Sequence, residues 1–578
     1  MEPGFGAHLR AAAAIVVPTA LANALEYLPV CFAVAIVGHQ STTQQSAERI
    51  ACELDALTLA RAFFNIVAGA PGFGVITALR TLCPQAVGAG RPRQCALALQ
   101  RAVAINCLLI LPLVVPLLFF SERLLLLTGQ PAEVAALAKP YCLRLLPSYF
   151  GVTGLSAVQR VYQAHGLNWA NFAIAAVVCA IAPVLQYGLV HWAGLGYLGA
   201  AWAAGALSLL YLGLLVPTLC ALGHGYVFRP LPLSIVLERK GMNQYLRLMA
   251  PGMLVCMLEW WILEAVILAA GRLKNPVVSI GAIAASGNLQ AVAIMAWIGC
   301  AVAASVNVGT AIGAGKVRSA RAAASAAIVV SLGLGLLLGG AIAALRRPLS
   351  RVFTDNAEID ALTALTLPIL GVVMVVDACS NAFGGVCSGL GLQRYTAGAQ
   401  LVGYYLVGMP LGVWLAFGWL HGAETGVLVL WAGTGLSMLI AAGLQAAALL
   451  RTDWHKCAAE SAARVRADDE RAAAQGMPPA DEPQSAALSS RLLADHAADL
   501  GHDYGLEDAE ARAGGLAPLT VPMPAPASAR CKPKPGSSGG VSSGGASSES
   551  AAGEPRPGQS PPSRTPSDSA DREGSADS

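Results

Sequence analysis

The stretch Gly74–Gly90 reads GVITALRTLCPQAVGAG, and 225 residues later the stretch Gly299–Gly315 reads GCAVAASVNVGTAIGAG. Each stretch closes a long apolar run with the tripeptide Gly-Ala-Gly, and a basic residue follows directly. Such self-similarity at a fixed distance is the sequence signature of an internal repeat. The two stretches therefore predict that the chain consists of two similar halves.

Further pairs support the repeat. The same distance relates Gly166 to Gly391. A distance of 233 residues relates Leu25-Glu26-Tyr27 to Leu258-Glu259-Trp260, and the prolines that precede them also correspond. An insertion of eight residues after the first apolar run accounts for the difference between the two distances.

The composition is that of a membrane protein. Hydrophobic residues make up 55% of the 578 residues and charged residues only 12%, against roughly 25% charged residues in a soluble domain. A spanning helix needs about 20 mostly apolar residues, and only helices or closed barrels satisfy every backbone group in hydrocarbon. The apolar runs are too long for barrel strands. We predict about twelve spanning helices, at residues 11–38, 57–79, 95–120, 136–160, 168–192, 196–222, 246–271, 277–304, 320–345, 360–390, 396–420 and 425–450.

Because six spans is an even number, both halves enter the membrane from the same side, as in transporter folds built from parallel repeats. The predicted fold is an all-α integral membrane protein with two pseudo-symmetric lobes of six helices and a disordered C-terminal tail. We predict a short cytoplasmic N-terminus (1–10), an N-terminal lobe (11–222), a cytoplasmic linker (223–245), a C-terminal lobe (246–450) and a cytoplasmic tail (451–578).

Basic residues in the loops predict the orientation. Loops after even-numbered spans carry Arg91, Arg160, Arg239, Lys316 and Arg394, among others, which places those loops in the cytoplasm. Both termini are then cytoplasmic, and the run that begins at residue 11 is a first span, too long for a signal sequence. The stretch that starts at Arg451 is amphipathic and is expected on the membrane surface to about residue 474. The Ser-, Gly- and Pro-rich remainder cannot bury enough apolar surface to fold.

Other classes of function are disfavoured. A net charge of +3 without a basic patch does not indicate nucleic acid as a partner. The fourteen cysteines include no CxxC pair, and the nine histidines include no HxxxH or HExxH arrangement, so we expect neither a metal nor an organic cofactor. Membrane enzymes of the prenyl-transfer type need paired DDxxD motifs, which the sequence lacks, and a seven-helix receptor would not contain two six-span repeats. We expect no enzymatic activity.

Carboxylates inside predicted spans are the main functional candidates, because charge in hydrocarbon is costly. The four are Glu26, Glu259, Glu264 and Asp377. A carboxylate that alternates between a neutral, protonated form and an anion that holds a cation can exchange a proton for an organic cation. Glu264 lies about 140° around the helix from Glu259 at 3.6 residues per turn, so the two cannot share one narrow face.

Glu259 is the strongest of these candidates. Pro251, two turns earlier, predicts a kink, and Trp260 and Trp261 follow directly. Aromatic faces attract cations, so this acidic and aromatic segment suits a cationic, partly apolar substrate. The alternative for each acid is a structural hydrogen bond to a neighbouring helix, and this alternative remains equally open for Glu26 and Glu264. The Gly-Ala-Gly tripeptides are predicted to form turns in which glycine permits positive φ and close approach of chains.

Several segments within about residues 15–460 share a recognisable pattern. They are Ala78–Gln85 with Gly88–Gly90 and Gln100–Ala102, Cys256–Trp261 with Glu264, Val302–Gly309 with Gly313–Gly315, Asp377, Gly389, Gly391, Gln393, Tyr404–Gly408, Pro410, and Arg451–Trp454. Together these segments resemble the multidrug and toxic compound extrusion (MATE) family of eukaryotic type.

The resemblance implies two six-helix lobes, cation-coupled export and substrates that are often organic cations. It also implies that Glu259, Glu264 and Asp377 couple proton movement to transport in the C-terminal lobe. We assign Trp260, Trp261, Tyr404 and Gln85 to the substrate cavity. The sequence departs from the family where Arg80 stands in place of a frequent Asp, Pro84 in place of Gly, and Asn288 at an acidic position of some animal members.

We therefore expect a secondary antiporter that exports organic cations, drugs or metabolites, driven by a proton gradient. Alternatives are sodium coupling, since carboxylates serve both ions, and a transporter of the same fold for organic anions, flavonoid conjugates or lipid-linked sugars. The expected partners are small organic molecules and the lipid bilayer, the expected state is a monomer, and the expected location is a plasma or vacuolar-type membrane.

Overall fold

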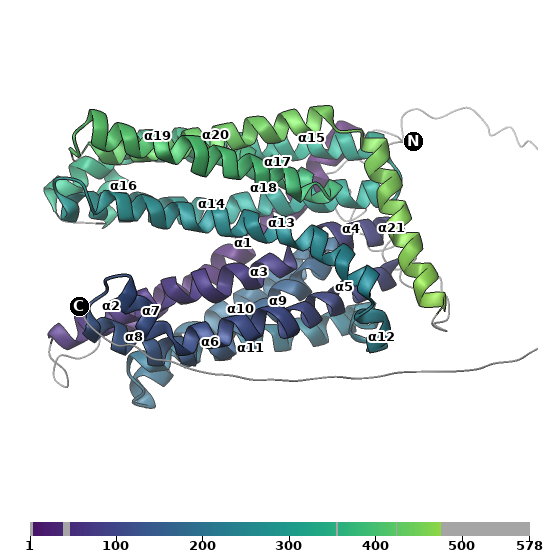
Figure 1. Ribbon diagram of the computed structural model, residues 1–578, viewed down its shortest axis with the longest axis horizontal. Helices are drawn as coiled ribbons and strands as arrows, with labels where there is room; N and C mark the ends of the chain where they lie inside the picture. The colour runs from purple at the N-terminus through teal and green to yellow at the C-terminus, as the bar shows by residue number, and fades with distance from the viewer. Residues whose placement is uncertain (1–3, 39–46, 354–355, 424, 475–578) are drawn as a thin grey trace, which may run out of the picture. The chain divides into compact units, whose positions relative to one another are not determined.

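The computed structural model describes residues 4–38, 47–353, 356–423 and 425–474, and throughout these residues it contains helices and no strands. Figure 1 shows the helices of the first half and those of the second half as two groups, with α21 (Trp454–Ala474) across one end of both. The predicted tail after residue 474 lies outside the described residues.

Eleven helical segments among the described residues are long and apolar enough to cross a membrane. Every predicted span except the fourth has its counterpart among them, and most extend several residues beyond the predicted ends. The segments are Phe5–Gly38, Glu48–Gly88, Pro92–Phe119, Asn168–Trp192, Tyr197–Phe228, Arg239–Ala270, Pro276–Gly313, Val317–Ala344, Ala357–Leu390, Gln393–Trp419 and Gly426–Arg451.

The fourth predicted span is divided into α8 (Ala132–Arg144) and α9 (Leu146–Ala164), with a break at Leu145. Pro147 lies in the first turn of α9, where its missing N–H is tolerated. The polar side chains of α9 are buried within the N-terminal lobe and do not face lipid. They lower the hydropathy of this helix, which is why it is not among the eleven segments. These side chains include Ser148, Tyr149, Thr153, Ser156, Gln159 and Arg160.

The two lobes make reciprocal contacts that follow the sequence repeat. A Cβ atom at Gly299 of α14 (Pro276–Gly313) would lie 2.9 Å from the carbonyl oxygen of Val16 in α1 (Phe5–Gly38). Correspondingly, a Cβ atom at Gly74 of α3 (Ala70–Ile76) would overlap Met253 of α13 (Arg239–Ala270). The first helix of each lobe thus packs against the second span of the other, which confirms the pseudo-symmetric fold.

The Gly-Ala-Gly segments form a second reciprocal contact. A Cβ atom at Gly88, at the end of α4 (Leu79–Gly88), would overlap the carbonyl oxygen of Thr310, and one at Gly313 would overlap that of Gln85. The last glycines of the two tripeptides have φ values of 69° and 71°, as predicted for turns. These turns and the close approach of chains at the glycines were predicted, and the structure shows that the chains in contact belong to different lobes.

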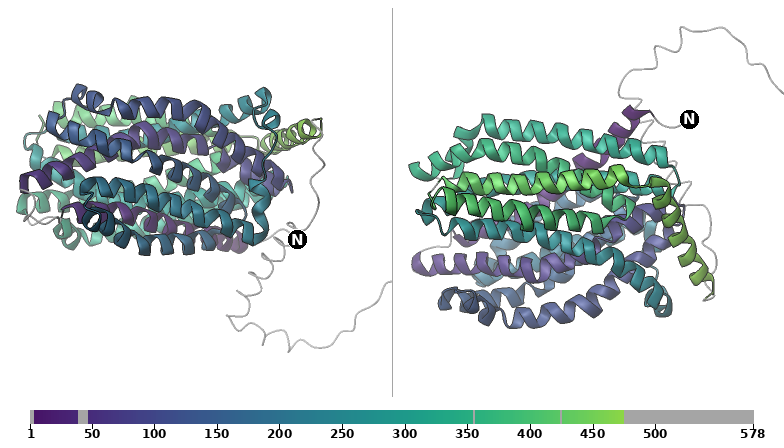
Figure 2. Two further views of the ribbon diagram at one scale, coloured as in Figure 1. Left: turned by 90° about the horizontal axis from the view of Figure 1, so that it is seen from below. Right: turned by 45° about the horizontal axis from the view of Figure 1, so that its top comes forward.

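Helix α21 differs from the expectation of a helix on the membrane surface. Trp454, Cys457 and Ser461 are at most 7% exposed, and the helix contacts α14, α15 (Val317–Ala344) and α17 (Ala357–Leu390) of the second lobe as well as α5 (Pro92–Ile105) of the first. Figure 2 shows the same helix from two further directions, across the ends of the spanning helices. The apolar stripe of α21 is covered by helix ends, which explains its amphipathic pattern without lipid.

Polar contacts fix α21 to the N-terminal lobe. The Oε1 atom of Gln85 accepts hydrogen bonds from Ser461 Oγ and Arg464 Nη2, both at 2.9 Å. Asp468 forms an ion pair with the buried Arg101, with 3.3 Å between Oδ1 and Nη1. Helix α21 therefore bridges the two lobes at the end that the basic loops predict to be cytoplasmic.

Replacing Arg464 by alanine is expected to loosen α21. A hydrogen bond from a charged donor contributes about 1.5–3 kcal/mol, so amide hydrogen exchange in residues 454–471 should accelerate by roughly 10- to 100-fold where local opening governs it. Mass spectrometry of exchange in detergent would measure the effect. Arg466→Ala, at an exposed position of the same helix, should leave the exchange rate unchanged, and an unchanged rate in the Arg464 variant would contradict this account of the contact.

Candidate functional site

Two acids of the C-terminal lobe lie within electrostatic range of each other, Glu259 on α13 and Asp377 on α17. The side-chain amide of Gln400 donates a hydrogen bond to Glu259 Oε1. Asn381 Nδ2 donates to Asp377 Oδ1 at 2.9 Å, and the side chain of Gln290 is a further partner of Asp377. Within the described residues neither acid forms an ion pair, so all their side-chain partners are neutral amides.

Burial differs between the two acids. Asp377 is only 5% exposed, whereas Glu259 is partly exposed. A carboxylate without a cationic partner is unfavourable in an apolar environment unless a proton or another cation neutralises it. The pair can therefore take up either, and the more exposed Glu259 is the more accessible of the two.

The sequence around Glu259 explains how it is held. The span that faces it changes from α18 (Gln393–Gln400) to the π-helical segment η6 (Leu401–Gly408) directly after Gln400. Within η6, Tyr405 Oη donates to the carbonyl oxygen of Leu258 at 3.1 Å. Such π-helical insertions often mark functional sites, and here one fixes the residues next to the acid.

The residues predicted to line the substrate cavity lie in different environments. Tyr404 is 3% exposed and lies within electrostatic range of both Glu259 and Asp377. Trp260 faces the other lobe, with its ring centroid 5.7 Å from that of Phe73. Trp261 is 41% exposed. Only Tyr404 therefore lies beside the acid pair, and Trp260 belongs to the contact between lobes.

Gln85 has a position that sequence reasoning did not predict. Its Nε2 atom donates to the carbonyl oxygen of Gly389 at 2.8 Å, and its Oε1 atom binds α21 as described above. The side chain is 2% exposed and joins α4, α17 and α21. We therefore interpret Gln85 as part of the contact that closes this end of the protein. The side chain of Glu264 lies outside the described residues, although its backbone belongs to α13.

Glu26 has its own cluster in the N-terminal lobe. Its Oε1 atom accepts hydrogen bonds from Gln159 Nε2 at 2.6 Å and Tyr211 Oη at 2.9 Å. Asn171 Oδ1 also accepts a hydrogen bond from Tyr211, at 3.1 Å. In both lobes the acid of the first helix thus accepts hydrogen bonds from other helices of its own lobe, Glu26 from the fourth and sixth spans and Glu259 from the fifth.

Two arginines lie between these acid clusters, and sequence reasoning did not include them in the site. Arg160 was assigned to a loop, but the structure places it inside α9, where it is 8% exposed and donates through Nη1 to Gln163 Oε1 at 2.7 Å. It lies within electrostatic range of Glu26 and of Arg80. Arg80 in turn lies within electrostatic range of Glu259. Their positions at predicted span ends hid them, because basic residues there normally indicate loops.

His165 is excluded as a proton carrier at neutral pH. His165 lies in the turn between α9 and α10 (Asn168–Tyr187), outside the spanning helices, with Nδ1 2.9 Å from the Val161 carbonyl and Nε2 2.8 Å from Tyr226 Oη. Burial and then the neighbouring His224 lower the pKa of His165 from 6.5 to about 4. The ring is therefore neutral wherever the pH lies well above 4.

We expect His165→Gln to leave the pH profile of transport unchanged between pH 6 and 8, because the side chain it removes does not titrate there. The pKa of His165 in the folded protein lies below its value in the unfolded chain. As the pH falls below about 6.5, the unfolded chain therefore binds the proton first, and the folded protein loses stability. Thermal denaturation from pH 8 to 5 should therefore show a smaller acid-induced loss in the variant than in the wild type. A shift of the transport profile would show instead that His165 carries protons.

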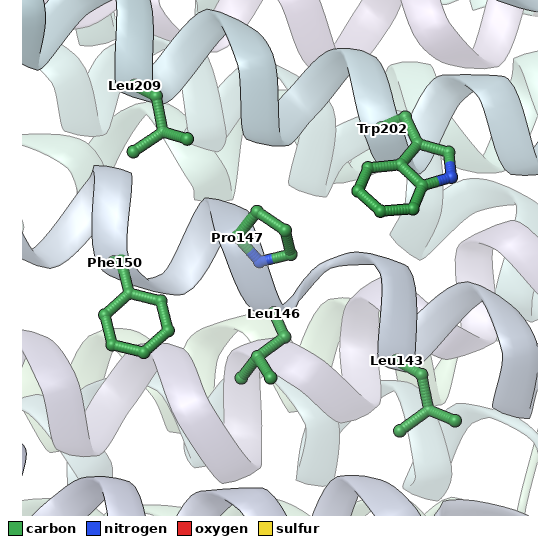
Figure 3. Close-up of a pocket in the computed structure, with 6 residues that line it drawn as sticks. All are labelled: Leu143, Leu146, Pro147, Phe150, Trp202 and Leu209. Carbon is green, nitrogen blue, oxygen red and sulfur yellow. The ribbon is translucent and has the colours of Figure 1, made fainter.

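An apolar hollow of about 410 Å³ lies against α8, α9 and α11 (Tyr197–Leu219), as Figure 3 shows. Its lining contains no ionisable side chain, so it does not suit a charged substrate, and its chemistry matches that of lipid chains. The lining residues are Leu143, Leu146, Pro147, Phe150, Trp202 and Leu209.

Two pseudo-symmetric helical lobes, each with a carboxylate inside its first spanning helix, define the class of polytopic secondary transporters. The MatE family model matches residues 18–187 and 251–414, one stretch in each lobe. The chain belongs to this family, which confirms the resemblance seen in its motifs.

Relatives and solved structures agree with this assignment. The chain is 31% identical to multidrug and toxin extrusion protein 2 of Mus musculus, over 72% of this chain and 70% of that protein. It is 28% identical to protein DETOXIFICATION 37 of Arabidopsis thaliana, over 72% of this chain and 81% of that protein. The crystal structure of the eukaryotic MATE transporter AtDTX14 superposes with a TM-score of 0.73 at 26% identity, over 80% of this chain and all of that one. The fold is also shared by a crystal structure of MATE in the straight conformation. That structure is 18% identical, with a TM-score of 0.63, over 80% of this chain and 97% of that one.

Proposed function

We propose that this protein exports organic cations, drugs or metabolites across a plasma or vacuolar-type membrane in exchange for protons. The observation that carries the proposal is the acid pair Glu259 and Asp377, whose side-chain partners in the described residues are the neutral amides of Gln400, Asn381 and Gln290. The printed names of the relatives, multidrug and toxin extrusion and DETOXIFICATION, support export of foreign organic molecules.

The coupling follows from competition for one negative charge. A substrate cation stabilises the ionised Glu259, and a proton neutralises the same group and removes the attraction for the cation. If the proton arrives from the side to which the substrate leaves, protonation releases the substrate there. The proton then travels back on the neutral carboxyl, and the proton gradient drives export without any catalytic step.

The experiment uses purified protein in liposomes with an acidic interior and the fluorescent cation rhodamine 123 outside. Faster uptake than in protein-free liposomes, abolished when nigericin collapses the pH gradient, supports the proposal. Uptake that responds only to an imposed sodium gradient would replace protons by sodium in the cycle. Uptake under neither gradient would refute cation export by this protein.

A further inference from the structure

Four buried side chains of the C-terminal lobe have polar atoms without hydrogen-bond partners among the described residues. They are Gln393, Thr396 and Gln400 of α18 and Gln445 of α20 (Gly426–Arg451), each at most 5% exposed. The atoms are Oε1 of Gln393 and Gln400, Oγ1 of Thr396, and both polar atoms of the Gln445 amide. Because buried polar groups nearly always bond to protein or to ordered water, these four side chains, the polar row, are expected to hold water.

The polar row leads from one end of the protein to Glu259. At 3.6 residues per turn, Thr396 and Gln400 lie within about 60° of Gln393 around α18, and at 1.5 Å per residue the three span about 10 Å of its length. Gln393, the first residue of α18, bonds to α4 at the end of the protein that α21 crosses. At the other end of the row, Gln400 donates to Glu259 Oε1. The row therefore connects the end predicted to be cytoplasmic with the acid.

Gln445 lies beside the middle of the row. A Cβ atom at Gly384 of α17 would lie 3.9 Å from both Gln445 Oε1 and Thr396 Cγ2. The glycine therefore leaves room between the two side chains, at a point that polar atoms border from two helices. The thiol of Cys387, one turn further along α17, lies next to the Thr396 side chain. Water in such a site needs two to four polar partners, and the polar row supplies them.

The N-terminal lobe covers the polar row at Gln393. Nε2 of Gln393 donates to Thr81 Oγ1 of α4, and Thr81 donates in turn to the carbonyl oxygen of Ser388 in α17. Gln393 is only 3% exposed in this arrangement. Separation of the lobes at this end would break the bond to Thr81 and open the row to the cytosol.

We propose that water held by the polar row conducts the proton between Glu259 and the cytosol, and that the contact of Gln393 with Thr81 closes this route until the lobes separate. The inference rests on the proposed function for the role of Glu259. In the release step, the O–H bond of protonated Glu259 breaks and its proton joins the water at Gln400 Oε1. The excess proton then passes from water to water and leaves at Gln393, and Glu259 remains as a carboxylate that can bind the next substrate cation.

The alternative is that these waters are only structural and that Glu259 releases its proton directly into the space between the lobes. Two modes of transport separate the alternatives. Uptake driven by a pH gradient requires Glu259 to release a proton to the cytosolic side in every cycle. Exchange of external for internal substrate at equal pH requires no such release. Damage to the polar row should therefore slow gradient-driven uptake and spare exchange.

The experiment measures both modes in liposomes with tritiated rhodamine 123. Thr396→Val removes the hydroxyl with little change of shape, and Gln445→Leu removes both amide atoms. Each variant should lose gradient-driven uptake by roughly tenfold or more, because it interrupts a positioned proton transfer, and should keep its rate of exchange. The matched control is Thr434→Val in α20, a buried threonine whose hydroxyl already donates to the Leu430 carbonyl at 2.9 Å, and it should change neither mode.

Unchanged gradient-driven uptake in Thr396→Val and Gln445→Leu would overturn the inference, and so would an equal loss of uptake and exchange. A second measurement does not depend on transport. Radicals formed by X-rays from bound water should oxidise Cys387, which is 0% exposed, and Gly384→Ala should reduce this oxidation because its methyl group takes the place of water. A wild type that moves no dye would contradict the proposed function. Oxidation of Cys387 would then still support a water-filled row, whereas its absence would overturn the inference.

Discussion

Glu259→Gln is expected to reduce proton-driven uptake of rhodamine 123 to the level of protein-free liposomes. Glutamine has nearly the same shape and can still bond to Gln400, so the fold should persist. It cannot release a proton or carry a negative charge, and the competition between proton and substrate disappears. The measurement is initial uptake at several internal pH values, which should show no pH dependence in the variant.

The control for Glu259→Gln is Glu122→Gln, which removes a carboxylate from a partly exposed pair with Lys139, 3.0 Å apart. Such an exposed pair contributes little, and this variant should transport like the wild type. If Glu259→Gln retained gradient-driven uptake, coupling would not depend on this residue. Asp377→Asn and Glu26→Gln would then show whether the other acid of the pair or the N-terminal cluster carries the proton.

Gly313→Val is expected to separate the lobes at their Gly-Ala-Gly ends and to abolish transport. The new Cβ atom would overlap the carbonyl group of Gln85, and a backbone atom within a packed helix cannot move aside as a flexible side chain can. Overpacking of a well-filled contact costs about 1–3 kcal/mol or more. The separation would also disturb the bonds from Gln85 to Gly389 and α21.

Hydrogen exchange of the α4 and α21 amides would measure this separation, with an expected acceleration of roughly tenfold or more for each 1.4 kcal/mol lost. Gly340→Val makes the same substitution in α15, where a Cβ atom would meet nothing within 4 Å, and should leave exchange and transport intact. The repeat predicts that Gly88→Val behaves like Gly313→Val. Normal exchange in both variants would show that the contact between lobes tolerates a wider spacing.

The sequence by itself determined the membrane class, the two-lobe repeat and the acids worth testing. Long apolar runs identify spans because the bilayer imposes one length and one composition on each. Repeated segments such as Gly74–Gly90 and Gly299–Gly315 reveal the symmetry because equivalent helices make equivalent contacts. Acids such as Glu259 and Asp377 are conspicuous because charge is rare in such runs.

Only the tertiary structure decided which groups accompany each acid. Gln400 reaches Glu259 across 141 residues of sequence, and Gln159 reaches Glu26 across 133. A spanning helix that is apolar on all sides carries little amphipathic signal for its inward face, so neither partner could be assigned from local pattern. The same long-range packing decides the position of Gln85, the burial of Arg160 and the place where α21 packs. Each of these features involves helices from both lobes or from distant spans.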